Sequence, residues 1–417
     1  MDANTQPGWK KGFWCLMVTQ SQNAFSDNAL KYLIILSAFA KLSQAEQNSH
    51  VALVSALFAV PFILLSMFAG WMADRLSKQR IMSTVKVVEI GIMLFAAMAL
   101  GLHLLPLQLA AIFMMGCHSA IFGPSKYGIL PEILPDEKLS WGNGLLELLT
   151  FIGIIAGTVT GSFLAEYITG PVYASGLLLA ALAVVGWRVS LHIPRVPAAD
   201  PHCAPRFNPV SDLWRQLRIM RRNRDLWRAN WGNTGFWFVA ALVGMNLLIY
   251  ATDVLHLNSA EIGLLNATLS IGIGIGSATA GFASRGRIQY GLVPIGAAGL
   301  ALSTIPMGLA GMSTIGFSAC LAALGFTGGL FIVPLAAALQ HIPPPESKGA
   351  VQGAANLLSW IGIFLASAVQ EVLKNTLGLT SGHIFWVCGA AALGTGVYAV
   401  ATRREALRQL WQTLTER

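Results

Sequence analysis

Long apolar segments alternate with short polar segments along the chain. They lie at residues 13–40, 51–73, 82–104, 106–130, 142–166, 171–192, 229–252, 262–284, 288–311, 314–340, 349–373 and 381–401. Each is close to the roughly 20 apolar residues that an α-helix needs to cross a bilayer. We therefore predict an all-α polytopic membrane protein with twelve transmembrane helices: an N-terminal six-helix half (1–192), a basic cytoplasmic linker (193–228) and a C-terminal six-helix half with a short tail (229–417).

Composition supports a membrane protein and argues against an enzyme. Hydrophobic residues make up 55% of the chain and charged residues 11%, with a mean hydropathy of +0.61. Soluble domains carry about 25% charged residues. The five cysteines are scattered without paired spacing, and no nucleophile–base pair or cofactor motif is present. We predict no catalytic residue, no metal and no cofactor.

The basic residues predict the orientation of the helices. Outer loops hold Lys41 and Lys374, and Lys31 and Lys126 fall within predicted helices. All other lysines and arginines, Lys86 among them, are assigned to the inner side, which is the cytoplasmic side in most membrane proteins. Both termini are therefore predicted to be cytoplasmic. The net charge of +8 then reflects topology and not a nucleic-acid partner.

The first apolar segment contains polar residues that share one helical face. Gln20, Asn23, Asp27 and Lys31 are spaced by three or four residues. An ionised side chain in the middle of a bilayer costs about 2.5–3.5 kcal/mol, so this face must turn toward protein or a water-filled cavity. We take Asn23, Asp27, Asn28 and Lys31 as candidate substrate-binding residues.

Further polar residues interrupt three other segments. Lys126 either extends to the membrane interface or faces the cavity, where it would attract an anion. Glu147 could pair with Lys126 or Lys31, as a structural tie or as a substrate contact. The remaining candidate substrate-binding residues are Tyr127, Asn143, Gln352 and Asn356.

The loop after the second segment carries a recognisable motif. Gly70 is followed four residues later by Asp74 and Arg75, and then by further basic residues including Arg80. This pattern resembles the cytoplasmic signature of the major facilitator superfamily, in which it helps to latch the cytoplasmic gate. A carboxylate there can cap a neighbouring helix, and arginine can tie facing helices together. The equivalent loop of the second half, residues 281–287, lacks the aspartate, so we expect its latch to be degraded or absent.

The linker and the second half add two expectations. A segment rich in arginine follows Ser211–Asp212 and predicts an amphipathic helix, which either lies on the anionic inner leaflet or tethers the halves. The central parts of the second-half segments hold amides and hydroxyls but no charge. An ionic first half opposite a mostly apolar second half favours an amphiphilic substrate with a charged head and a fatty tail.

Five motifs together resemble the lysophospholipid transporter family of the major facilitator superfamily, and the related domain fused to some acyltransferases. They are FSDNALK (25–31), GPSKYGILPE (123–132), NGLLE (143–147), GGLFIVPLAAALQ (328–340) and IPPPESKGAVQGAANLLSWIGIFLAS (342–367). The resemblance implies the major facilitator fold and places the family's functional acid on Asp27 and its fourth-helix lysine on Lys126. Some members have an arginine in the seventh helix, soon after a Phe-Trp pair. Here no basic residue follows Phe236–Trp237 up to Leu248.

The resemblance also implies a function. Members move lysophosphatidylethanolamine and related lysolipids from the outer to the inner leaflet of the bacterial inner membrane. The expected partners are the lysophospholipid, the bilayer, and a cytoplasmic acyltransferase or acyl-carrier-protein ligase. Lys126 and Lys31 would attract the phosphate, and Asp27 or Glu147 the ammonium group. Two alternatives stay open: a proton-coupled exporter of amphipathic drugs, and a membrane anchor for an acyltransferase that transports nothing.

Overall fold

The computed structural model describes residues 9–39, 43–167, 173–204, 208–309, 311–401 and 405–415. Within these ranges the chain is helical and contains no β-strand. The first group of helices is α1 (Trp9–Phe39), α2 (Gln44–Arg75), α3 (Lys78–Gly101), α4 (Leu105–Ile133), η2 (Asp136–Lys138), α5 (Leu139–Tyr167), α6 (Tyr173–Ser190) and α7 (Pro209–Met220). The second is α8 (Arg224–Asp253), α9 (Ser259–Ala283), α10 (Leu292–Met307), α11 (Thr314–His341), η3 (Pro345–Ser347), α12 (Lys348–Glu371), η4 (Val372–Thr376), α13 (Ser381–Val400) and α14 (Ala406–Thr415).

Every predicted membrane segment contains a helix. Ten helices of the described chain are long and apolar enough to cross a membrane, and the chain is a multi-pass membrane protein. Of the two others, α1 has 31 residues but carries polar side chains that lower its mean hydropathy. The other, α10, is apolar but has only 16 residues. The all-helical membrane fold is confirmed, although the predicted count of twelve spans is not met in full.

Short polar side chains define where several helices begin. At the start of α9, the side chain of Asn258 accepts a hydrogen bond from the backbone nitrogen of Glu261, and the Glu261 carboxylate accepts one from the backbone nitrogen of Asn258. Ser313 and Thr380 cap α11 and α13 in a simpler way. These contacts satisfy amide groups that have no partner inside the helix.

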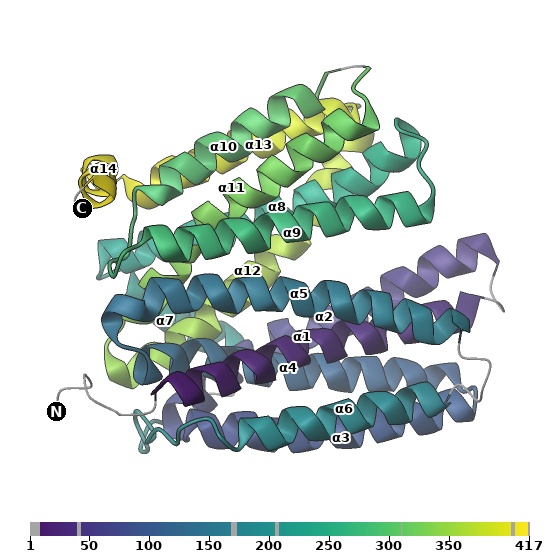
Figure 1. Cartoon of the computed structure of the whole chain (residues 1–417), viewed down its shortest axis with the longest axis horizontal. Helices are drawn as coiled ribbons and strands as arrows, with labels where there is room; N and C mark the ends of the chain where they lie inside the picture. The colour runs from purple at the N-terminus through teal and green to yellow at the C-terminus, as the bar shows by residue number, and fades with distance from the viewer. Residues whose placement is uncertain are drawn as a thin grey trace. The chain divides into compact units, whose positions relative to one another are not determined.

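The two sets of helices repeat one packing pattern. In the first, α4 contacts α1, α2 and α3, while α6 contacts α1 and α3. In the second, α11 contacts α8, α9 and α10, while α13 contacts α8 and α10. Successive helices run in alternating directions within each set (Figure 1). The match of α1–α4 and α6 with α8–α11 and α13 is the internal repeat expected of a transporter built from two related halves.

The described chain divides into two compact units. Unit 1 comprises Met1–Pro135, Leu149–Gln216 and Pro344–Leu357, and unit 2 comprises Asp136–Leu148, Leu217–Pro343 and Leu358–Arg417. The first part of α5, up to Leu148, thus belongs to unit 2. The first part of α12, up to Leu357, belongs to unit 1. The boundaries predicted at residues 192 and 229 stay a prediction.

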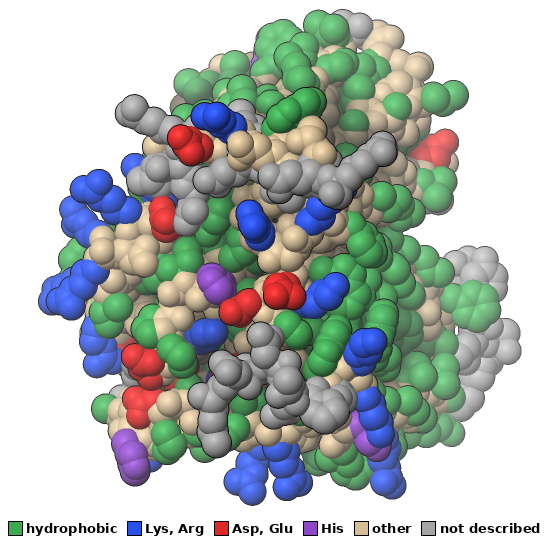
Figure 2. Space-filling view, turned by 60° about the vertical axis from the view of Figure 1, so that its left-hand side comes forward, with side chains coloured by type: hydrophobic (Ala, Val, Ile, Leu, Met, Phe, Trp, Pro, Cys, Tyr) green, Lys and Arg blue, Asp and Glu red, His purple; other side chains and the backbone are tan. Residues whose placement is uncertain are grey.

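Apolar side chains cover much of the surface, as lipid contact requires. Large hydrophobic side chains such as Val159, Phe163, Phe282 and Leu302 are more than half exposed. The face shown in Figure 2 carries Lys, Arg, Asp and Glu side chains, bordered by apolar surface. Lys41, one of the two lysines predicted outside, lies outside the described residues.

The predicted linker helix is present as α7. It begins at Pro209, because the side chain of Asn208 accepts hydrogen bonds from the backbone nitrogens of Val210 and Ser211. The helix therefore starts two residues before the predicted Ser211–Asp212 start. Trp214 on this helix is 65% exposed, so α7 presents an aromatic side chain at its surface.

Candidate functional site

The polar face of α1 is buried against other helices of unit 1. Gln20 and Asn23 are 1% and 5% exposed, and Asp27 is half-buried. The Gln20 side chain donates to Thr150 Oγ1 of α5 at 3.0 Å. The Ser21 hydroxyl donates to the Leu149 carbonyl at 3.0 Å. Of the two predicted surroundings for this face, protein or a water-filled cavity, Gln20 and Asn23 lie against protein.

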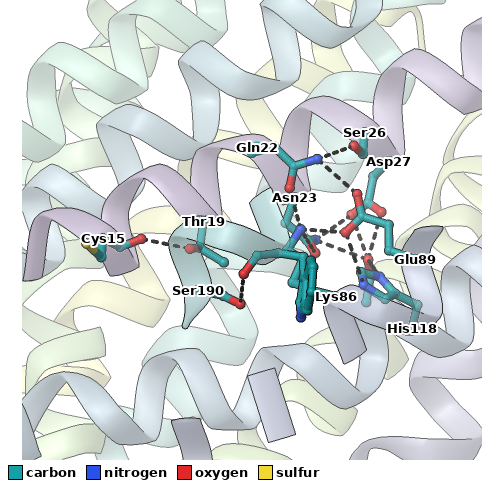
Figure 3. Close-up of polar contacts among 12 residues, drawn as sticks. Cys15, Thr19, Gln22, Asn23, Ser26, Asp27, Lys86, Glu89, His118 and Ser190 are labelled. Carbon is teal, nitrogen blue, oxygen red and sulfur yellow. Dashed lines mark hydrogen bonds and ion pairs between the residues drawn. The ribbon is translucent and has the colours of Figure 1, made fainter. Parts of the chain in front are cut away.

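Helices α3 and α4 complete a buried group of charged and polar side chains, the charge cluster. Its members are Gln22, Asn23 and Asp27 of α1, Lys86 and Glu89 of α3, and His118 and Ser119 of α4 (Figure 3). Lys86 and Glu89 are fully buried, and His118 is 3% exposed. All seven residues belong to unit 1, so the cluster is a property of one compact unit.

Neutral donors hold the carboxylate of Asp27. The Ser119 hydroxyl lies 2.7 Å from each of its oxygens, and Asn23 Nδ2 donates to Oδ2 at 3.1 Å. Hydrogen bonds to an ionised group contribute about 1.5–3 kcal/mol each when they replace water. Asp27 is thereby fixed in orientation without an ion pair among the described residues.

Lys86 and Glu89 form the ion pair at the centre of the cluster. Lys86 Nζ lies 2.5 Å from Glu89 Oε2 and donates to Gln22 Oε1 at 2.6 Å and to Asn23 Oδ1 at 3.2 Å. Gln22 Nε2 donates to Glu89 Oε1 at 3.0 Å. A buried pair offsets its cost of desolvation only when further hydrogen bonds satisfy both charges, and here the amides of α1 supply them.

His118 connects the ion pair to Asp27. Its Nε2 lies 3.4 Å from Glu89 Oε2, and its Nδ1 lies 3.4 Å from Ser119 Oγ. The ring is stacked on Phe122 with an interplanar angle of 10°. The histidine therefore lies between the two carboxylates and faces neither lipid nor a loop.

The sequence prediction for Lys86 was wrong. It assigned this lysine to the inner surface, whereas the side chain is fully buried within α3. Glu89 was missed altogether. The signal was present in the sequence, since a lysine and a glutamate three residues apart interrupt the apolar segment at 82–104.

The two lysines predicted to bind substrate lie on aromatic rings. Lys31 Nζ is 5.6 Å from the centre of the Phe58 ring and 5.8 Å from that of Tyr32. Lys126 Nζ is 4.7 Å from the centre of the Tyr127 ring. Such cation–π contacts stabilise a cation in an apolar setting. Among the described residues, no ion pair joins Lys31 to Asp27.

The other predicted substrate-binding residues occupy several places. Asn28 donates to the Ala24 carbonyl of its own helix at 2.8 Å. Asn356 of α12 donates to Ser66 Oγ of α2 at 2.9 Å, within unit 1. Glu147 and Gln352 are buried, at 5% and 7% exposure. Their roles in binding stay predictions.

The loop after α2 contains a helix cap. Asp74 is 1% exposed, and its two oxygens accept hydrogen bonds from the backbone nitrogens of Gly349 at 2.6 Å and Ala350 at 2.8 Å. These amides belong to the first turn of α12, where a negative charge is also stabilised by the positive end of the helix dipole. A Cβ atom on Gly70 would lie 2.6 Å from the Gly349 carbonyl, so α2 and α12 meet through backbone.

The basic residues of this loop have separate partners. Arg75 donates to the Cys203 carbonyl at 3.3 Å and stacks on Trp71, whereas Arg80 is exposed. Lys78, which the sequence placed among the inner charges, is fully buried and pairs with Glu132 of α4 at 2.6 Å. The gating role of Gly70, Asp74, Arg75 and Arg80 stays a prediction.

An amide pair joins α5 to α11 in unit 2. Asn143 of α5 donates to Gln340 Oε1 of α11 at 3.0 Å, and Gln340 donates back to Asn143 Oδ1 at 2.7 Å. Ser140 donates to the Arg287 carbonyl at 3.3 Å. Neutral hydrogen bonds therefore join the first part of α5 to α11 and to the loop at residues 281–287, which contains no aspartate.

The fold agrees with comparisons to known proteins. The family model described as Major Facilitator Superfamily matches residues 16–367. The chain belongs to this superfamily, which confirms the predicted fold and the prediction of a transporter rather than an enzyme.

Curated relatives give a finer match. The lysophospholipid transporter LplT of Klebsiella pneumoniae (strain 342) is 29% identical over 400 residues, covering 93% of this chain and 97% of that protein. LplT of Serratia proteamaculans (strain 568) is 31% identical over 379 residues, covering 87% and 84%. The resemblance to the lysophospholipid transporter family is thereby confirmed.

Solved structures confirm the fold alone. The human organic anion transporter MFSD10 aligns with a TM-score of 0.77 at 15% identity, covering 94% of this chain and 100% of that one. The transporter FucP in its outward conformation aligns with a TM-score of 0.72 at 14% identity, covering 93% and 98%.

Proposed function

We propose that the chain is a lysophospholipid transporter that works by alternating access. The observation that carries this proposal is the match to curated lysophospholipid transporters over nearly the full length of both chains. In our proposal, lysophosphatidylethanolamine and related lysolipids move from the outer to the inner leaflet of the bacterial inner membrane. Both termini face the cytoplasm, where an acyltransferase or acyl-carrier-protein ligase takes up the product.

The charges of unit 1 suit a zwitterionic headgroup. Asp27 offers a carboxylate held by neutral donors, and Lys31 and Lys126 are half-buried cations on aromatic rings. Opposite charges in a medium of low dielectric constant attract the phosphate and ammonium groups strongly. In contrast, α8 carries no charged residue between Arg228 and Asp253. An apolar helix of this kind suits the single acyl tail.

Uptake of labelled lysophosphatidylethanolamine by proteoliposomes tests the proposal. The double variant Asp27→Asn with Lys126→Ala should lose most uptake, because each change removes one half of the headgroup recognition. The matched control is Asp253→Asn with Lys374→Ala, which removes an exposed acid and an exposed base that pair at 3.3 Å. Full uptake by the first double variant would contradict charge recognition of the headgroup.

The two alternatives predict different outcomes in the same assay. A proton-coupled exporter of amphipathic drugs would move dye and leave the lysolipid in place. A membrane anchor for an acyltransferase would bind that enzyme and move neither molecule.

A further inference from the structure

The linker helix α7 turns apolar side chains outward. Val210 is 77% exposed and Trp214 is 65% exposed. On the same helix the polar residues Asp212 and Gln216 are only 7% and 2% exposed. A surface helix of a soluble protein has the reverse arrangement, with its apolar side chains against the protein and its polar side chains in water. The outward side of α7 is therefore suited to a partner that covers apolar groups.

The outward residues lie in a stripe along the helix. Positions i, i+3, i+4 and i+7, which share one side of an α-helix, are occupied by Val210, Leu213, Trp214 and Leu217. These four residues form the apolar stripe of α7. Ile219, which is 45% exposed, lies about 180° around the helix from Val210. The apolar stripe thus occupies one side of α7, and Ile219 marks the opposite side.

Basic residues continue this side of the helix. The segment from Pro209 to Arg224 contains one aspartate and five arginines, all exposed: Arg215, Arg218, Arg221, Arg222 and Arg224. Arg218 and Arg221 follow the apolar stripe at helical spacing, since the backbone nitrogen of Arg221 still donates to the Leu217 carbonyl at 2.9 Å. Guanidinium groups bind phosphate through paired hydrogen bonds. So basic a surface repels a second copy of itself and attracts an anionic one.

The connection to α8 holds α7 close to the bilayer. Helix α8 has 30 residues and is about 45 Å long, which matches the roughly 40–45 Å of a bilayer with its headgroups. It therefore begins, at Arg224, at the level of the headgroups. Four peptide units separate Met220, the end of α7, from Arg224, so the two lie within about 15 Å of each other. Trp227 and Trp231 of α8 pack edge to face near this end, as aromatic residues do at a membrane interface.

We propose that α7 lies on the bilayer surface and binds phospholipids with anionic headgroups, in the leaflet at which α8 begins. The apolar stripe enters the boundary between headgroups and acyl chains, where the ring of Trp214 finds both an apolar and a polar environment. Arg218 and Arg221 bind the lipid phosphates, while Asp212 and Gln216 stay on the buried side. This docking does not depend on what the protein transports.

A fluorescent probe at two positions of α7 tests which side contacts lipid. The full chain, with its 5 native cysteines replaced, receives a single labelled cysteine at Val210 or at Ile219 and is reconstituted in nanodiscs that contain phosphatidylglycerol. Lipids with a nitroxide near the headgroup quench a fluorophore that they touch. We expect the Val210 probe to be quenched at least about threefold more than the Ile219 probe, because the two positions face opposite ways. Equal quenching at the two positions overturns the proposal.

The lipid charge and the arginines are then varied. Nanodiscs of phosphatidylcholine alone should lower quenching of the Val210 probe at least about twofold, and so should Arg218→Ala with Arg221→Ala in phosphatidylglycerol. The matched control, Lys138→Ala with Arg195→Ala, removes two exposed cations outside α7 and should keep the wild-type quenching. Quenching that is insensitive to the lipid charge, or to the two arginines of α7, shows that anionic lipid is not the partner and overturns the proposal.

A second readout keeps the native cysteines. The 12 tryptophans are replaced by 5-fluorotryptophan, and the variant Trp214→Phe assigns the ¹⁹F resonance of Trp214. A nitroxide lipid should broaden this resonance strongly in phosphatidylglycerol nanodiscs and much less in phosphatidylcholine nanodiscs. A Trp214 resonance that is broadened by a water-soluble nitroxide and not by the nitroxide lipid shows that α7 lies in water, and the proposal is then wrong.

Discussion

At the scale of single residues, the protein places its charges where each has a defined partner. Lys86 and Glu89 neutralise each other, the amides of Gln22 and Asn23 complete their hydrogen bonds, and Ser119 orients Asp27. Polar side chains inside a membrane protein are costly unless they are satisfied in this way. The charge cluster therefore fixes how α1, α3 and α4 meet.

Breaking the central ion pair should destabilise the protein. Lys86→Met leaves Glu89 buried without its cation, and we expect a loss of about 3–5 kcal/mol in the free energy of unfolding. Adding Glu89→Gln to Lys86→Met removes the unpaired charge and should restore a large part of this loss. Thermal unfolding of the detergent-solubilised variants measures both changes. Equal stability of the single and double variants would show that the pair does not act as a unit.

Sequence patterns found part of this site. Asp27 and Asn23 were recognised because four polar residues recur at helical spacing in one apolar segment. Lys86 was not recognised, because a basic residue near the start of a helix can equally be a charge of the preceding loop. Which side chains of α3 and α4 face α1 depends on how these helices are rotated, and local spacing contains no information about that.

At the scale of helices, small residues set the distances between neighbours. A Cβ atom on Gly276 of α9 would collide with the Phe326 carbonyl of α11. Lipid gives no hydrophobic driving force for helix association, so close backbone packing contributes much of the stability. The lack of a side chain at Gly276 therefore permits the close approach of α9 and α11.

The variant Gly276→Ala should push α9 and α11 apart. We expect it to cost about 1–3 kcal/mol in the free energy of unfolding, because the backbone at Phe326 cannot move aside cheaply. Gly263→Ala is the control in the same helix, since a Cβ there would meet nothing within 4 Å. Thermal unfolding compares the two. A loss of stability in the control as large as in Gly276→Ala would argue against the packing explanation.

The cap on α12 makes a second prediction at this scale. Asp74→Ala removes both acceptors for Gly349 and Ala350, and we expect the start of α12 to lose about 0.5–2 kcal/mol of local stability. Hydrogen exchange of these two amides should become faster. Asp200→Ala changes an acid whose side chain, within the described residues, accepts a hydrogen bond from the backbone nitrogen of His202 alone, and it should leave the exchange unchanged. Unchanged exchange in Asp74→Ala would mean that other contacts hold α12.

At the scale of the whole molecule, the hydropathy pattern predicted the helices well. Each apolar segment contains one helix, and the boundaries mostly agree within a few residues. In lipid a long apolar segment must satisfy its backbone hydrogen bonds internally, and a helix does so. The two compact units were not predictable in this way. They depend on contacts such as Asn143 with Gln340 and Asp74 with Gly349, which join residues far apart in the sequence.

Fusions to reporter proteins test the predicted topology. Green fluorescent protein attached after Arg417 should fluoresce, because both termini are expected in the cytoplasm. Alkaline phosphatase inserted at Gly378, in the loop beside Lys374, should be active, because that loop is expected outside. The opposite pair of results would reverse the orientation, and with it the proposed direction of transport.

The burial of polar residues in α1 has a consequence for how the protein is made. This helix leaves the ribosome before α3 and α4, yet its side chains Gln22, Asn23 and Asp27 have partners on those two helices. Until Ser119 has been synthesised, α1 lacks the partners from α3 and α4 that complete the hydrogen bonds of these groups, and it stays close to the insertion machinery or the interface. The early intermediate is therefore the form most exposed to cellular quality control. Substitutions at Lys86, Glu89 or Ser119 should lower the amount of protein in the membrane before they alter what it transports.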